Sequence, residues 1–197
     1  MAGLLVAFEG LDQSGKQTQA ERLRAHVIAG GRECRLLSFP DYDTPIGREL
    51  ARALRDEHEY GADVMQLLYV ANRYEKRPQI EQWLRDGVIV LSDRYVASSV
   101  AYGEAQGLDA GWLVEIQRFL PPPDLTILLD IAPETAAARK ARGRDRYERD
   151  LALLARVRES YARQAEKPAW VKLDGERPQD AVAADVVTAV ARRLEPR

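Results

Sequence analysis

Short apolar segments alternate with longer segments of helical periodicity along most of the chain. Five apolar runs have the length of strands, at residues 4–8, 34–39, 88–91, 125–131 and 169–173. Continuous apolar runs are typical of parallel strands buried on both faces, and parallel strands require connections long enough to contain a helix. The pattern predicts an α/β fold of three layers, in which a five-stranded parallel sheet carries helices on both faces.

One edge of this sheet should carry the functional residues, because ligands of open parallel sheets bind beyond the carboxyl ends of the strands. The segments expected at that edge are residues 10–18, 39–43, 93–95, 131–134 and 174–175. No repeat, low-complexity tract or linker interrupts the chain. We therefore expect residues 1–197 to form a single domain.

A glycine-containing loop follows the first predicted strand and precedes a helix expected over residues 17–29. Its pattern is G-x-x-x-x-G-K, in which backbone N–H groups and the helix N-terminus can surround phosphates while Lys16 reaches the outer ones. The hydroxyl that normally follows the lysine and binds Mg²⁺ is replaced by Gln17, and the nearest hydroxyl is that of Thr18. A glycine-rich turn that binds nothing is the alternative. The predicted nucleotide-binding residues are Gly10, Leu11, Asp12, Gln13, Ser14, Gly15, Lys16, Gln17 and Thr18.

A second candidate site lies on a helix predicted over residues 63–83, which Pro78 is expected to kink or to end early. Tyr69 and Arg73 are four residues apart and therefore share a face of this helix. A planar ring beside a guanidinium suits a ligand that has both a base and a charge, whereas an exposed Tyr–Arg stack without a ligand is the alternative. Phe39, at the end of the second predicted strand, either forms a wall of the same pocket or closes the core.

The third predicted strand ends in an acidic and a basic residue. Asp93 occupies a position from which a carboxylate near a phosphate loop can hold Mg²⁺ directly or through water, and Arg94 is placed to meet a second phosphate. A surface ion pair between these two residues is the alternative. The short helix expected next carries Ser98, Ser99 and Tyr102, of which Ser98 and Tyr102 share a face.

A basic cluster follows the fourth predicted strand. Six basic residues lie within eleven positions around Gly143: Arg139, Lys140, Arg142, Arg144, Arg146 and Arg149. A charge run is usually a solvated helix face. Beside a phosphate loop, we instead predict a lid over about residues 139–150 that closes arginines over the transferring phosphates.

Composition narrows the class of protein. The 29 Lys and Arg residues and 31 Asp and Glu residues leave a net charge of −2, which gives no reason to expect a nucleic-acid polymer or a membrane as a partner. Cys34 is the single cysteine, which excludes an internal disulfide and fits a reducing compartment, and we expect it to be buried. His26 and His58 are both expected in helices and far apart, which argues against zinc binding and histidine-based catalysis. No apolar stretch approaches the ~18 residues of a membrane span, so we expect a cytoplasmic protein.

The phosphate loop, the two arginines and the basic cluster together favour phosphoryl transfer. This reaction needs the attacking and leaving oxygens in line and the negative charge of the phosphates neutralised, and it needs little covalent chemistry from the protein. Lys16, the loop amides and Mg²⁺ would hold the donor. Arg73 and Arg94 would hold the acceptor, and one lid arginine would contact the group in transfer.

Several motifs, in this order and spacing, resemble those of thymidylate kinases. They are Phe8-Glu9-Gly10-Leu11-Asp12 with Gly15-Lys16, Phe39-Pro40, Ala71-Asn72-Arg73, Asp93-Arg94-Tyr95 and Arg146-Tyr147-Glu148. The resemblance covers nearly the whole chain, and the Asp-Arg-Tyr and Ala-Asn-Arg triplets are more specific than the phosphate loop. It implies a nucleoside monophosphate kinase of the P-loop fold that makes dTDP from dTMP and ATP.

The resemblance also implies roles in binding dTMP. Tyr69 would stack on thymine, where the family often has Phe, and Arg73 would contact the base and the phosphate. Arg94 would bind the acceptor phosphate. Asp12 would bind the sugar 3′-hydroxyl, and Tyr102 would disfavour a 2′-hydroxyl.

Further implications concern the base edge and the catalytic arginine. Ser98 and Ser99 lie where relatives have a polar side chain or glycine near the base edge. Family members carry a catalytic arginine either in the phosphate loop or in the lid, and Gln13 occupies the loop position here. The candidates are therefore Arg142, Arg144 and Arg149. The family is usually dimeric, so the resemblance implies a homodimer.

Two other functions are compatible with parts of this pattern. A deoxynucleoside kinase has the same architecture but phosphorylates a sugar hydroxyl, whereas Arg73 and Arg94 suit an anionic acceptor. A non-catalytic ATP-binding module would be consistent with Gln17, because the missing hydroxyl could weaken Mg²⁺ binding, but the basic cluster argues against it.

Overall fold

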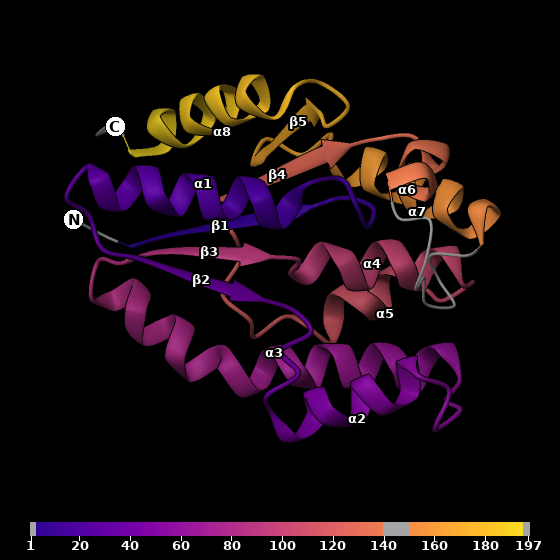
Figure 1. Cartoon of the computed structure of the whole chain (residues 1–197). Coiled ribbons are helices and arrows are strands. Elements are labelled where there is room, and N and C mark those ends of the chain that lie inside the picture. The colour runs from indigo at the N-terminus through magenta and orange to yellow at the C-terminus, as the bar shows by residue number, and fades with distance from the viewer. Residues whose placement is uncertain (1–2, 140–149, 195–197) are drawn as a thin grey trace.

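The protein, represented by a computed structural model that describes residues 3–139 and 150–194, is built on a parallel sheet (Figure 1). The described strands are β1 (Leu4–Glu9), β2 (Cys34–Ser38), β3 (Ile89–Asp93), β4 (Leu125–Asp130) and β5 (Trp170–Asp174). Their order across the sheet is β2-β3-β1-β4-β5, and every neighbouring pair is parallel. This confirms the predicted five-stranded parallel sheet.

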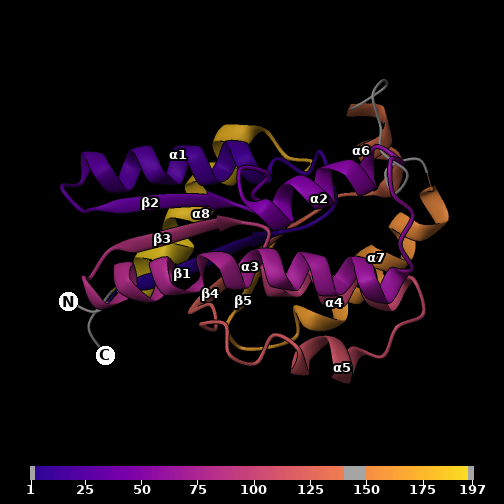
Figure 2. The same ribbon diagram turned by 90° about the horizontal axis from the view of Figure 1, so that it is seen from below.

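Helices cover both faces of the sheet, as Figures 1 and 2 show. On one face, α1 and α8 pack against each other and the sheet, and the opposite face carries α3, α4 and α7. The described helices are α1 (Lys16–Ala29), α2 (Pro45–Leu54), α3 (Ala62–Arg85), α4 (Val96–Ala105), α5 (Ala110–Glu115), α6 (Pro133–Arg139), α7 (Leu151–Gln164) and α8 (Gln179–Leu194). In this part of the chain, not one helix combines the length and the apolar character needed to cross a membrane.

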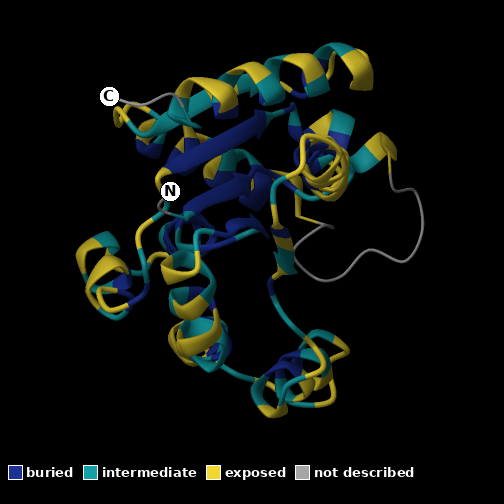
Figure 3. Ribbon diagram, turned by 90° about the vertical axis from the view of Figure 1, so that its left-hand side faces the viewer, coloured by how far each residue is buried: buried dark blue, intermediate teal, exposed yellow. Residues whose placement is uncertain are grey.

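The core follows the alternation of side chains along the central strands. Leu4, Val6 and Phe8 of β1 face α1 and α8, whereas Leu5 and Ala7 face the opposite helix layer. Both sets are buried, and Figure 3 shows the sheet as the buried centre of the molecule. A strand buried on both faces explains why its sequence is apolar throughout rather than alternating.

Two expectations about local structure need correction. Pro78 does not end its helix, because α3 continues to Arg85 with the proline inside it. His58 lies outside the helices, between α2 and α3, where its ring contacts Glu49 and Arg52. The prediction for Cys34 is confirmed: the thiol is buried, and burial raises its pKa to about 11.

The strand register brings the functional segments to one edge. Phe8 of β1 and Ser38 of β2 both pair with Asp93 of β3. The backbone N–H of Arg94 then donates to the carbonyl of Phe8 (2.9 Å), and that of Phe39 donates to the carbonyl of Asp93 (2.9 Å). The phosphate loop, Phe39 and Arg94 therefore begin side by side, although they come from distant parts of the sequence.

Candidate functional site

The loop between β1 and α1 has a backbone that depends on glycine. Gly10 has φ +138°, and a Cβ there would lie 2.4 Å from the carbonyl oxygen of Leu129. Gly15 has φ +95° and directly precedes the first residue of α1. The loop therefore turns sharply into the helix N-terminus, which is the geometry that directs backbone amides at phosphates.

Lys16 begins α1 and is buried at the base of this loop. Its Nζ donates to the carbonyl of Leu11 (2.8 Å), and only 5 % of the residue is exposed. Burial lowers its pKa, an effect that Arg94 reinforces and that Asp12 and Asp93 oppose. The ammonium is held inside the loop, with its charge near the carboxylates of Asp12, Asp93 and Glu9 and near the guanidinium of Arg94.

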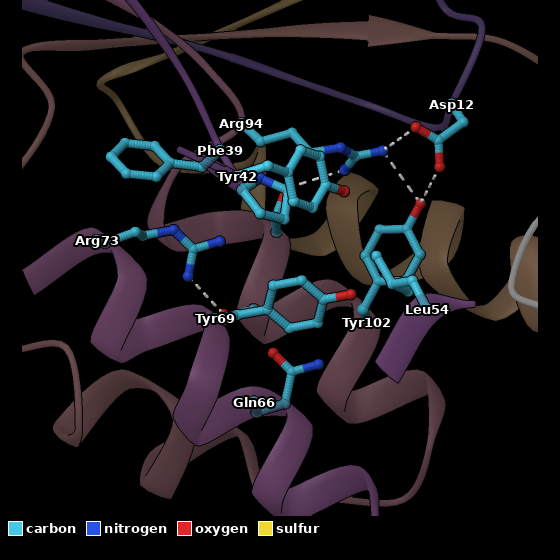
Figure 4. Close-up of a pocket in the computed structure, with 12 residues that line it drawn as sticks. Asp12, Phe39, Tyr42, Leu54, Gln66, Tyr69, Arg73, Arg94 and Tyr102 are labelled. Carbon is cyan, nitrogen blue, oxygen red and sulfur yellow. Dashed lines mark hydrogen bonds and ion pairs between the residues drawn. The ribbon is translucent and has the colours of Figure 1, made fainter. Parts of the chain in front are cut away.

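Two cavities adjoin this loop. The larger, of about 630 Å³, is lined by residues 12–19 of the loop and α1, by Asp93, and by Gly175 and Gln179 after β5. The smaller, of about 110 Å³, lies beside it and includes Tyr69, Arg73 and Tyr102 (Figure 4). Five residues line both cavities, so the two form one continuous site: Asp12, Phe39, Pro40, Tyr42 and Arg94.

Arg94 stands at the boundary between the cavities with φ +62°. Its Nη2 contacts Asp12 Oδ1 (2.7 Å) and the Tyr102 hydroxyl (3.3 Å), and its Cζ lies 5.2 Å from the centre of the Tyr102 ring. Burial raises the pKa of Asp12, but Arg94 and Lys16 outweigh that effect and hold it well below its usual range. The alternative of an Asp93–Arg94 surface pair is wrong, because the carboxylate partner of Arg94 is Asp12.

Arg73 is buried at the other end of the smaller cavity, which corrects the alternative of an exposed Tyr–Arg stack. Its Nη1 donates to Ser99 Oγ (2.7 Å) and Gln117 Oε1 (3.3 Å), and its Cζ lies 6.0 Å from the Phe39 ring centre. Within the described residues, its Nε has no hydrogen-bond partner and no carboxylate forms an ion pair with it. Burial lowers the pKa of Arg73 to about 10, so it remains charged at neutral pH.

Phe39 both closes the core and forms part of the pocket wall, the two roles considered for it from the sequence. It is 3 % exposed and packs in the core with Tyr95, and it also lines both cavities. Tyr69 lies in the middle of the smaller cavity, between Arg73 and Tyr102 in Figure 4. The side chains predicted to bind a base and a phosphate therefore surround one space.

Asp93 provides a test of whether the site fits a cation. Its Oδ1 is buried without a hydrogen-bond partner in the described part of the chain, and the residue lines the larger cavity beside Thr18. Gln17 instead turns outward, where its amide donates to Glu21 (2.9 Å). The described residues contain no cluster of three or more metal-ligating side chains. A carboxylate that lines a phosphate cavity and leaves one oxygen without a protein partner fits a metal ion that is held mostly by nucleotide phosphates and water.

The predicted lid lies mostly outside the described residues, and so do all three candidate catalytic arginines, Arg142, Arg144 and Arg149. Arg139, the first member of the basic cluster, is described. Its Nη1 donates to the carbonyl of Gln13 and its Nη2 to that of Gly175, both at 3.0 Å. Arg139 therefore ties α6 to the phosphate loop.

Several side chains in or near the site were not predicted: Leu54 and Gln66 line the smaller cavity, and Glu9, Tyr161 and Gln117 lie behind it. Glu9 and Tyr161 contact Ser98 behind Arg94, and Gln117 contacts Arg73. Glu9 belongs to one of the motifs that resemble thymidylate kinases, and it is a charged residue at the end of an apolar strand. Both features could have identified it as a functional residue. Tyr161 and Gln117 have no local signal in the sequence.

The comparisons with known proteins agree with this geometry. The family model for thymidylate kinase matches residues 8–186. The chain belongs to the thymidylate kinase family. A thymidylate kinase of Schizosaccharomyces pombe is 39 % identical over 147 residues, which cover 75 % of this chain and 70 % of that protein. The thymidylate kinase of Plasmodium falciparum is 32 % identical over 196 residues, covering 98 % of this chain and 93 % of the other.

One Arabidopsis thaliana thymidylate kinase is 40 % identical over 147 residues, which are 75 % of this chain and 56 % of that protein. Among solved structures, thymidylate kinase from Candida albicans superimposes with a TM-score of 0.87 at 29 % identity and covers 98 % of this chain and 94 % of its own. The chain has the thymidylate kinase fold and is an ATP-dependent phosphotransferase acting on dTMP.

Proposed function

We propose that the smaller cavity binds dTMP, that the larger one binds ATP, and that the two phosphate ends meet at Arg94. The observation that carries this assignment is the position of Arg94, which lines both cavities, while Lys16 lines only the larger and Arg73 only the smaller. Joined cavities meet the need of phosphoryl transfer for donor and acceptor oxygens in line.

In the smaller cavity, we assign the base to Tyr69 and Arg73 and the sugar to Asp12 and Tyr102. Tyr69 stacks on thymine, and the guanidinium of Arg73, which lines this cavity, contacts the base and the phosphate. Asp12 accepts from the 3′-hydroxyl, and the Tyr102 ring limits space for a 2′-hydroxyl. Three more residues complete the wall of this cavity. Ser98 accepts a hydrogen bond from Arg94, Ser99 accepts one from Arg73, and the face of the Phe39 ring lies against the Arg73 guanidinium.

In the larger cavity, we assign the donor phosphates to the amides of residues 10–18 and to Lys16. Gly175, Arg177 and Gln179 extend the cavity beyond the phosphate loop and are the proposed surroundings of the adenosine. A lid arginine, from among Arg142, Arg144 and Arg149, remains the proposed contact to the group in transfer, and such an arginine can contribute ~10³-fold or more to the rate.

We propose Mg²⁺ as the cofactor, held by Asp93, with Thr18 as the first hydroxyl after Lys16 in the sequence. Bound there, the ion would neutralise charge on the donor phosphates. Asp93 supports this assignment through its unpaired Oδ1, and Gln17 does not, because its side chain turns away. We further propose a cytoplasmic homodimer, a location consistent with the single buried thiol.

A coupled ADP-release assay with dTMP, dUMP, dAMP, dGMP, dCMP and thymidine tests the reaction. We expect turnover with dTMP to exceed turnover with every other acceptor. A preference for thymidine would instead indicate a nucleoside kinase, and ATP binding without turnover of any acceptor would indicate a non-catalytic module.

Two variants test the placement of donor and acceptor. Lys16→Ala should abolish turnover and leave the Kd for dTMP nearly unchanged, because Lys16 does not line the smaller cavity. Arg94→Ala should raise the KM for dTMP much more than the KM for ATP. A large loss of dTMP affinity in Lys16→Ala would show that the two sites are assigned wrongly.

A further inference from the structure

A buried carboxylate lies behind the proposed acceptor arginine. Glu9, the last residue of β1, is 0 % exposed. Its Oε1 accepts the backbone N–H groups of Tyr95 (2.9 Å) and Ser98 (3.2 Å), and its Oε2 accepts the hydroxyls of Ser98 (2.6 Å) and Tyr161 (3.0 Å). These four donors satisfy the carboxylate.

The same two hydroxyls also contact Arg94, whose Nη1 donates to Ser98 Oγ (3.0 Å) and Tyr161 Oη (3.3 Å). A guanidinium can only donate and a carboxylate can only accept. The hydroxyls between them must therefore direct their protons toward Glu9, either directly or, for one of them, through the 2.8 Å contact between the two oxygens. Their lone pairs are left to face Arg94.

This arrangement holds Arg94 from two sides. Asp12 and Tyr102 contact Nη2, whereas Ser98, in the wall of the smaller cavity, and Tyr161, behind it, contact Nη1. Tyr161 comes from α7, is 1 % exposed, and is not among the described residues that line either cavity. It contacts the arginine without reaching the space proposed for substrate.

We infer that Glu9 and Tyr161 are positioning residues for Arg94: Glu9 sets the direction of two hydroxyl groups, and these present acceptor oxygens that orient the guanidinium toward the acceptor phosphate. The inference rests on the proposed function, in which Arg94 binds the phosphate of dTMP. It links β1 and α7 to the affinity for the acceptor through Arg94, and neither Glu9 nor Tyr161 is among the described residues that line either cavity.

Glu9→Gln is the most direct test, since it keeps the size and shape of the side chain and replaces the acceptor Oε2, which faces the two hydroxyls, with a donor. The amide oxygen must accept the two backbone N–H groups, so the NH₂ group takes the position of Oε2 and donates to the hydroxyls. Their protons then turn toward Nη1 of Arg94 and repel it. We expect the Kd of dTMP, measured by calorimetry without ATP, to rise by about tenfold or more.

Tyr161→Phe removes only one oxygen and keeps the buried ring. We expect the Kd and KM for dTMP to rise about five- to tenfold, while the KM for ATP changes by less than about twofold. The matched control is Ser160→Ala, which deletes a fully buried hydroxyl on the same helix that donates to Glu104 of α4 rather than contacting Arg94. It should lower the melting temperature without this split between dTMP and ATP.

The outcomes separate the inference from the proposed function. Wild-type protein that does not phosphorylate dTMP would overturn the function and the inference with it. An active wild-type enzyme in which Tyr161→Phe matches Ser160→Ala in both KM values would overturn the inference alone. If Glu9→Gln does not fold, the KM values of Tyr161→Phe, compared with those of Ser160→Ala, still test the inference.

Discussion

The two arginines of the smaller cavity differ in how their charges are compensated. Arg94 lies 2.7 Å from the carboxylate of Asp12. The charges of Arg94 and Lys16 together keep the pKa of Asp12 low. Arg73 has only the neutral acceptors Ser99 and Gln117 at Nη1, among the described residues. Arg73 therefore has no carboxylate in direct contact within the described residues, although the charge of Glu9 favours its protonated form, and a buried cation so placed gains stability when an anionic or oxygen-rich ligand binds.

The lowered pKa of Asp12 makes a prediction about acid stability. A carboxylate whose pKa is lower in the folded than in the unfolded state contributes stability that is present above about pH 4 and is lost as the pH falls toward the folded value. The melting temperature of wild-type protein should therefore exceed that of Asp12→Asn most at neutral pH. The difference should shrink progressively below about pH 4, as measured by thermal unfolding from pH 7 to pH 2.5.

Asp43→Asn serves as the control for this comparison, because Asp43 is exposed and forms no ion pair within the described residues. Its difference from wild type should stay small throughout. A pH-independent difference for Asp12→Asn would contradict the assigned charge interaction with Arg94 and Lys16.

At the scale of elements, the turn after α5 supports the base side of the smaller cavity. Gln117 lies in this turn and is 5 % exposed. Its Nε2 donates to the carbonyls of Leu113 (2.8 Å) and Val96 (3.2 Å), which fixes Oε1 as an acceptor for Arg73. Tyr74 of α3 donates to the carbonyl of Ile116 (3.0 Å) in the same turn, so α3, α4 and α5 are joined around Arg73.

Replacement of Gln117 should therefore affect dTMP more than ATP. We expect Gln117→Leu to raise the KM for dTMP about five- to tenfold and to leave the KM for ATP nearly unchanged, since Arg73 loses a fixed acceptor. Gln106→Leu is a matched control, because Gln106 makes the same kind of 2.8 Å bond to a carbonyl four residues earlier and does not contact Arg73. Equal KM values for dTMP in the two variants would refute this role.

At the scale of the whole molecule, the strand order explains why distant motifs form one site. β1 lies in the centre of the sheet, with β3 and β4 as its neighbours. The chain passes from β1 to β2 on one side of the sheet and crosses from β3 to β4 on the other side. The crevice at such a switch point lies beyond the carboxyl ends of the strands, where the phosphate loop and Arg94 are found. Outside this region, Val64 and Leu67 of α3 are 38 % and 46 % exposed.

The proposed homodimer can be tested at this exposed apolar face. If α3 forms the interface, wild-type protein should elute at twice the chain mass of 22.2 kDa, and Leu67→Glu should elute near the chain mass, because a buried unpaired charge opposes association. Light scattering coupled to gel filtration measures both. Ile28→Glu, at an equally exposed apolar residue on α1, should remain dimeric. A wild-type monomer would contradict the homodimer.

Much of the fold was predictable because its signals are local. The strand at residues 125–131 and the helix at residues 17–29 differ from β4 and α1 by single residues, since apolar runs and a glycine loop act on neighbouring positions. The effect of Pro78 was not predictable in the same way. A helix can continue past a proline, despite the lost hydrogen bond, when residues before and after the proline pack in the core. Ile80, two residues beyond Pro78, is fully buried.

The sequence by itself determined the five strands, the phosphate loop and the family motifs, because periodicity, glycine spacing and residue type are properties of short segments. Only the tertiary structure decided which side chains meet: Arg94 contacts Asp12 across 82 positions, and Glu9 contacts Tyr161 across 152. Such contacts follow from strand order and register, which no local pattern encodes. The physical reason is that burial and hydrogen bonding depend on distances in space, and the packed sheet sets those distances.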